Sequence, residues 1–144
     1  RLHALLEARN RPYVVYLSTA LHEGASLDPE PFSDLFDIYG DRLFFLGALS
    51  DVAVESYIRD CTYVAAFFPK GLRANNTTVN AALDVGATVV TNLDEYSTVC
   101  DRNDMNIVDI GLCETLIPCS GRGVRDDVHD VLSWGALVDI VKDA

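Results

Sequence analysis

Short runs of apolar residues alternate along the chain with segments in which apolar residues recur every three or four positions. The runs are continuous and rich in β-branched and aromatic residues, which is typical of buried strands, whereas the spaced repeats are typical of helices with one buried face. The strands that this pattern predicts cover residues 13–17, 43–46, 63–68, 88–91 and 106–110.

Local signals mark where the expected helices begin and end. The first helix carries Leu2, Leu5 and Leu6 and stops before Asn10. Prolines in a first turn, polar caps and terminal glycines then delimit further helices. These run from Asp28 to a stop at Gly40, from a cap at Ser50, and over 77–85 to a stop at Gly86; two more are expected around Val124–Leu132 and after a cap at Ser133.

Because strands and helices alternate throughout, we expect an α/β fold. The sequence predicts a Rossmann-like three-layer domain, with a mainly parallel sheet of about five strands and helices on both faces. Residues 1–144 form a single domain in this interpretation. The polar stretch 93–104 is longer than a usual connection, and long connections of this kind often carry function.

Composition narrows the classes of partner. The chain has 144 residues, 49% of them hydrophobic, which is enough for one independent core. Its 22 acidic and 11 basic residues give a formal charge of -11. That field repels nucleic acids and anionic membranes, so neither is an expected partner. A small phosphorylated ligand remains compatible, because backbone amides and a few cations can form a local anion site.

The cysteines and the termini bear on location. Cys61, Cys100, Cys113 and Cys119 are spaced too widely for a zinc knuckle, so we expect four reduced thiols and no metal. The sequence shows no signal peptide and no apolar run of transmembrane length, which favours the cytoplasm. Since it starts at Arg1 inside an expected helix, we expect a piece of a longer protein.

The richest candidate site follows the strand at 63–68. Ligands of open parallel sheets bind beyond the carboxyl ends of the strands, and this strand runs through a glycine loop into a helix. Cations and the free N–H groups of a helix N-terminus suit a diphosphate without a metal or cofactor. The alternative is that an asparagine merely caps the helix and that the cations are solvated. The candidate diphosphate ligands are Lys70, Gly71, Arg73, Asn75, Asn76, Thr77 and Thr78.

The ends of the other strands offer further candidates. The first connection has no G-x-G-x-x-G fingerprint, which argues against a dinucleotide. His22 lies beside Glu23 and could act as an oriented base, although adjacent residues need not face each other. Candidate sugar or base contacts at the ends of the other strands are Ser18, Thr19, Gly47 and Asn92.

Residues 43–51, 57–61, 63–72 and 77–90 together resemble the donor-binding domain of GT-B glycosyltransferases. The matching features are LFFLGALSD, the run YVAAFFPKGL and the helix that leads to GATVV, with Ser133-Trp134 similar to the start of that family's last helix. The resemblance implies a nucleotide-sugar donor and a second, N-terminal acceptor domain outside this sequence. The catalytic residues cannot be assigned, because a general base would lie on that other domain.

The sequence also departs from this family's pattern. Many retaining members carry two glutamates eight positions apart, and the corresponding positions here hold Arg73 and Ala81. Two interpretations follow: a donor-binding domain that transfers a sugar with altered contacts, or a non-catalytic Rossmann-like module with a degenerate donor site. A third, a phosphatase or isomerase, would use His22 with Asp94 and Glu95.

Overall fold

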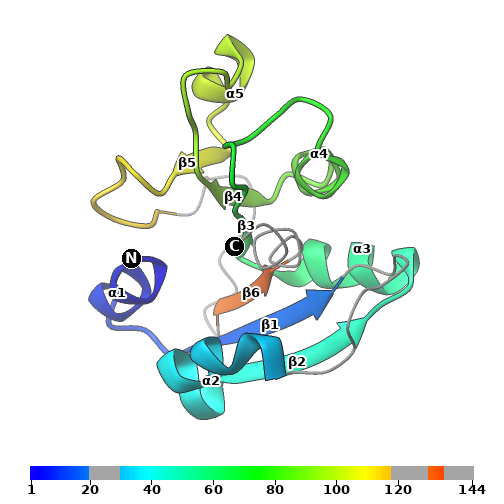
Figure 1. Cartoon of the computed structure of the whole chain (residues 1–144), viewed down its shortest axis with the longest axis vertical. Coiled ribbons are helices and arrows are strands. Elements are labelled where there is room, and N and C mark those ends of the chain that lie inside the picture. Colours follow the sequence, from blue (N-terminus) through cyan, green and yellow to red (C-terminus); the bar gives the residue numbers. More distant parts are fainter. Residues whose placement is uncertain (20–29, 118–129, 135–144) are drawn as a thin grey trace.

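The computed structural model describes residues 1–19, 30–117 and 130–134, and these form one sheet covered by helices (Figure 1). Its strands are β1 (Tyr13–Thr19), β2 (Leu43–Ala48), β3 (Tyr63–Ala66), β4 (Thr88–Thr91), β5 (Ile107–Asp109) and β6 (Asp130–Trp134). The α-helices are α1 (Leu2–Ala8), α2 (Ser33–Tyr39), α3 (Asp51–Asp60), α4 (Thr77–Asp84) and α5 (Val99–Asn103). Short 3-10 helices, η1 (Glu30–Phe32) and η2 (Gly40–Arg42), flank α2.

The sheet is parallel throughout, with the strand order β2-β1-β6-β3-β4-β5. Among the described strands, β6 lies between β1 and β3 and joins the pair β1–β2 to the trio β3–β4–β5. Leu17 and Ala65 both take Trp134 as their register partner. The described part of the chain is therefore an α/β domain with six parallel strands, close to the five that the pattern predicts.

Alternation along β3 explains why helices cover both faces. Tyr63 and Ala65 belong to a core that includes the buried leucines of α1 and Tyr39 of α2. Val64 and Ala66 belong to a second core on the opposite face, with residues of α3 and α4. All four side chains of β3 are buried, as a strand covered on both sides requires. The expected three-layer, Rossmann-like arrangement is confirmed.

Most of the expected helix boundaries are found. Ser50 caps α3 by accepting a hydrogen bond from the Ala53 amide, and Gly40 follows α2 with a φ of 56°. The segment around Ser133 is different, because Asp130–Trp134 is a strand and not the end of one helix and the cap of the next. Here the parallel pairing with both β1 and β3 outweighs the local signal, since a central position satisfies backbone groups on both sides. The other residues of those two expected helices lie outside the described ranges.

A polar group fastens α1 to the amino end of β1. The Tyr13 hydroxyl donates to Glu7 at 2.6 Å, and Arg42 donates to the same carboxylate. The Arg42 guanidinium also lies 4.3 Å from the centroid of the Tyr13 ring. This cluster stabilises the edge of the sheet opposite to the one where ligands of parallel sheets bind.

Candidate functional site

The strand order places the reversal of the chain path at β6. From β1 the chain moves outward to β2, whereas β3, β4 and β5 proceed in the other direction. In open α/β sheets the ligand crevice lies at such a reversal, beyond the carboxyl ends of the strands. The candidate site is therefore built from the ends of β1 and β3 and from the connections that follow β3 and β4.

The β3–α4 loop (residues 67–76) is attached to the end of β4 by backbone and amide hydrogen bonds. The Asn92 side chain accepts from the Phe68 amide at 2.8 Å and donates to the Phe68 carbonyl at 2.7 Å. In addition, the Leu72 amide donates to the Asn92 carbonyl at 2.9 Å, and the Leu72 side chain is buried. Asn92, a candidate sugar or base contact, thus has both ends of its amide bound to the protein backbone.

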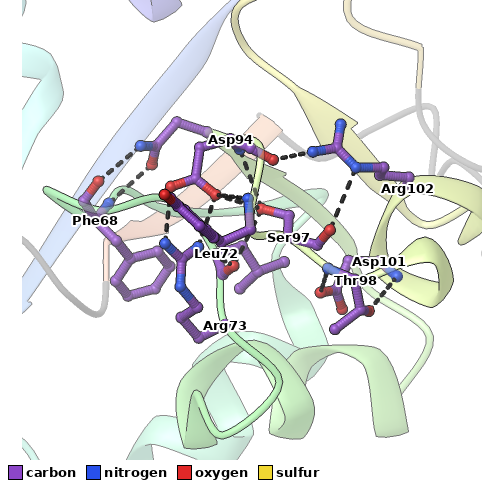
Figure 2. Close-up of polar contacts among 10 residues, drawn as sticks. Phe68, Leu72, Arg73, Asp94, Ser97, Thr98, Asp101 and Arg102 are labelled. Carbon is purple, nitrogen blue, oxygen red and sulfur yellow. Dashed lines mark hydrogen bonds and ion pairs between the residues drawn. The ribbon is translucent and has the colours of Figure 1, made fainter.

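Arg73 and Asp94 form a two-pronged ion pair between the β3–α4 loop and the β4–α5 loop (residues 92–98), as Figure 2 shows. Arg73 donates from Nη1 to Oδ1 and from Nη2 to Oδ2, each at 2.8 Å. These hydrogen bonds lower the pKa of Asp94 to about 2, and the same contact raises the pKa of Arg73. The charge that the sequence offered for a diphosphate is therefore already matched by a carboxylate.

Position 71 requires a glycine because a side chain there would clash with Asp94. The φ of Gly71 is +68°, which favours glycine, and a Cβ added there would lie 2.6 Å from Asp94 Cγ. Gly71, a candidate diphosphate ligand, thus lies in close contact with a side chain of this protein.

Hydrogen bonds of Asp94 organise the β4–α5 loop. Its Oδ1 accepts from the Tyr96 amide at 2.9 Å, and its own amide donates to Ser97 Oγ at 3.1 Å. Ser97 in turn donates to the Leu72 carbonyl at 3.1 Å. From α5, Arg102 donates to the Ser97 and Asp94 carbonyls. The two loops together form one hydrogen-bonded unit (Figure 2).

The N-terminus of α4 lies at the end of this unit. Asn76 is its cap and accepts from the Val79 amide at 3.1 Å, as one of the two interpretations of the loop asparagines predicts. Within the described ranges the amides of Thr77 and Thr78 have no hydrogen-bond acceptor. Asn75 and Thr77 are exposed at this end of the helix, and Lys70 is exposed in the β3–α4 loop that leads to it. Two backbone donors and one exposed cation are thus available to an anion.

The remaining candidates lie apart from this unit. Ser18 is buried in β1 and takes Gly47 of β2 as its register partner, where the ladder shifts. Thr19 pairs with Ala48. They border the end of β1, on the other side of β6. His22 and Glu23 lie outside the described ranges.

Reasoning from sequence missed the partners of Arg73, although Asp94 and Glu95 were noted as an acidic pair. The signal was the Asp94-x-x-Ser97 spacing, since an aspartate and a serine three positions apart often close a turn through their side chains. The Asp94 carboxyl stays ionised at neutral pH because its pKa is about 2. A carboxyl with so low a pKa is a weak general base at that pH, and His22, with which the phosphatase or isomerase interpretation pairs it, lies outside the described ranges.

Two further properties of the described residues bear on function. No three of their histidine, cysteine or acidic side chains are gathered in a way that could hold a metal ion. None of the helices in these ranges has the length and apolar character needed to cross a membrane.

Comparisons with protein-family models, with curated proteins and with solved structures find no match for this chain.

Proposed function

We propose that this chain is the nucleotide-sugar donor-binding domain of a glycosyltransferase, which transfers a sugar from a nucleoside diphosphate to an acceptor held by another domain. The observation that carries the proposal is the start of α4. A fully buried parallel strand leads through a glycine loop to a helix terminus where the described residues offer no acceptor to the Thr77 and Thr78 amides. Such amides, at the positive end of the helix dipole, suit a phosphate.

In this proposal Lys70 replaces Arg73 as the main cation. Lys70 is exposed, and the described residues offer it no ion pair, whereas Arg73 is bound to Asp94. During transfer the bond from the anomeric carbon to the diphosphate breaks, and negative charge develops on the leaving group. Lys70 and the two amides would stabilise that charge without a metal or cofactor. The Thr77 and Thr78 hydroxyls are further donors at the same terminus.

The Arg73–Asp94 pair favours a second candidate function. In this alternative the chain is a non-catalytic Rossmann-like module whose nucleotide-sugar site is degenerate. A cation that is committed to a carboxylate contributes little to binding a diphosphate. In a degenerate site, an ion pair of this kind would stabilise the two loops and nothing more.

Isothermal titration with UDP, GDP and ADP separates the two candidates. For a donor-binding domain we expect one of these nucleotides to bind with a dissociation constant below 1 mM, and Lys70→Ala to weaken it about tenfold through the loss of a charge-assisted contact. Added salt should weaken the binding by wild type more than the binding by the variant.

Arg11→Ala is the matched control for Lys70→Ala, because Arg11 is an exposed cation just before β1, at the opposite edge of the sheet. Its removal should leave nucleotide affinity unchanged. Equal losses in the two variants would mean that only the net charge of the protein matters. Absence of binding by wild type at millimolar nucleotide would favour the non-catalytic module.

A further inference from the structure

Tyr96 is a large aromatic side chain that the fold holds in an exposed position at the carboxyl edge of the sheet. It is 72% exposed. Its amide is fixed by Asp94 Oδ1 at 2.9 Å, and Arg73 Cζ lies 5.6 Å from the centroid of its ring. An exposed ring beside a fixed guanidinium loses little conformational freedom when a ligand covers it, so ordering it costs little.

The Arg73–Asp94 pair beside the ring keeps unused hydrogen-bonding capacity. Oδ1 of Asp94 accepts from Arg73 and Tyr96 and lies 3.3 Å from Ser97 Oγ, whose single proton it would share with the Leu72 carbonyl, whereas Oδ2 accepts from Arg73 alone among the described residues. A carboxylate oxygen offers about two lone pairs, so Oδ2 retains one. On Arg73, Nη1 donates twice and Nη2 once, which leaves the Nε proton and one Nη2 proton.

This combination selects for hydroxyl groups over phosphate. The ion pair has no net charge, and Glu95 is exposed next to it, so a second anion gains little attraction there. A hydroxyl group, in contrast, is both donor and acceptor, and two neighbouring hydroxyls match one free carboxylate lone pair and two free guanidinium protons. The less polar C–H face of a sugar ring can cover the exposed aromatic ring next to them.

We infer that Tyr96, together with the Arg73–Asp94 pair, is the platform for the sugar ring of the ligand, while the start of α4 receives its diphosphate. This inference rests on the proposed function and divides the ligand between the two connected loops. The sugar lies against the β4–α5 loop, and the phosphates lie at the end of the β3–α4 loop. The Arg73–Asp94 pair therefore forms hydrogen bonds with the hydroxyl groups of the sugar and does not neutralise the charge of the diphosphate.

The test compares a nucleoside diphosphate with its sugar conjugates by isothermal titration. The nucleotide that binds best among UDP, GDP and ADP is measured alone and as its glucose, galactose, mannose and N-acetylglucosamine conjugates. For wild type we expect at least one conjugate to bind more tightly than the free nucleotide. Tyr96→Ala should weaken the binding of that conjugate about fivefold, because a stacked aromatic contact is lost. The affinity for the free nucleotide should stay unchanged. Tyr96→Phe keeps the ring and should bind like wild type.

Met105→Ala is the control for loss of an exposed apolar side chain. Met105 is 86% exposed and precedes β5, at the opposite edge of the sheet, so its removal should change neither affinity. If Tyr96→Ala lowers the affinity for the nucleotide and for the conjugate by the same factor, or changes neither affinity, the sugar platform is refuted. The proposal that the domain binds a nucleotide then still stands. If wild type binds no nucleotide and no conjugate, the proposed function fails and the platform fails with it.

Discussion

Arg73 donates to both carboxylate oxygens of Asp94 and so connects the β3–α4 loop with the β4–α5 loop. The two residues are 21 positions apart. The pair therefore fixes the relative position of two connections that follow neighbouring strands, β3 and β4. Any ligand at this edge meets a surface that is already ordered, which reduces the entropy lost on binding.

The first prediction concerns pH. The pKa of Asp94 is about 2 in the folded protein and near the ordinary value of 3.8 in the unfolded chain. A carboxyl whose pKa is depressed by folding stabilises the native state above its unfolded pKa, and this contribution is lost as pH falls through the folded value. In thermal melts, Asp94→Asn should therefore melt below wild type at pH 7, and the difference should shrink between pH 4 and pH 2. A difference that is constant down to pH 2 would contradict the ion pair.

A second prediction uses two glycines with similar backbone angles. Gly71 and Gly86 have φ values of +68° and +71°, but a Cβ would meet Asp94 only at Gly71 and nothing within 4 Å at Gly86. Gly86→Ala should lower the free energy of unfolding by about 1–2 kcal/mol, the strain of the left-handed conformation. Gly71→Ala should lower it further because of the added clash. Urea denaturation of both variants measures the difference.

The double variant Gly71→Ala with Asp94→Ala identifies the cause of that difference. Removing the carboxylate makes space for the new methyl group, so the loss caused by Gly71→Ala should be smaller in the Asp94→Ala background than in wild type. Losses of the same size in both backgrounds would show that the clash lies elsewhere.

The third prediction separates the two loop asparagines. Asn76 caps α4, so Asn76→Ala should destabilise the fold by about 1 kcal/mol. Asn75 is exposed and makes no hydrogen bond to the described residues, so Asn75→Ala should leave stability unchanged. Chemical denaturation checks both. If Asn75→Ala lowered the stability more than Asn76→Ala, Asn75 would be the cap of the helix. The free amides would then lie one residue earlier.

A fourth prediction concerns a buried hydroxyl. Thr91 is fully buried at the carboxyl end of β4, and its Oγ1 has no hydrogen-bond partner in the described structure. Replacing such a hydroxyl by a methyl group removes a desolvation penalty, so Thr91→Val should raise the free energy of unfolding by about 1 kcal/mol. Thr88→Val is the comparison, since Thr88 is buried on the same strand but its hydroxyl is not among the buried side-chain oxygens that lack a partner. It should not stabilise the protein. A loss of stability in Thr91→Val would instead show that the hydroxyl is satisfied.

The elements that sequence predicts best are those in which local signals agree with burial. Strand β3 is a continuous apolar run, and α3 and α4 begin at polar caps, so hydrophobic pattern and capping lead to the same boundaries. The polar stretch 93–104 was predicted only as a long connection, and α5 lies within it. Its signal was present in the reciprocal hydrogen bonds of Thr98 and Asp101, whose spacing is that of a capping box.

Local sequence signals do not predict the strand at 130–134 or the ion pair between Arg73 and Asp94. An apolar run such as Val131-Leu132 suits either a helix face or a buried strand, and only its neighbours β1 and β3 decide between them. In the same way, a cation in a loop is equally compatible with a ligand or with a carboxylate 21 positions further on. The local sequence contains no information about which of the two lies within reach.

The position of β6 also has a consequence for how the chain folds. Its register partners in β1 are more than a hundred positions away in sequence, and those in β3 are about seventy away. Closing loops of this length carries an entropy cost before any contact between distant strands is formed, so topologies with a high contact order fold slowly. The pair β1–β2 and the trio β3–β4–β5 can each form from shorter-range contacts. Joining them requires β6, which follows both groups in the described part of the chain, so we expect the pairing of β6 with β1 and β3 to be a late step of folding.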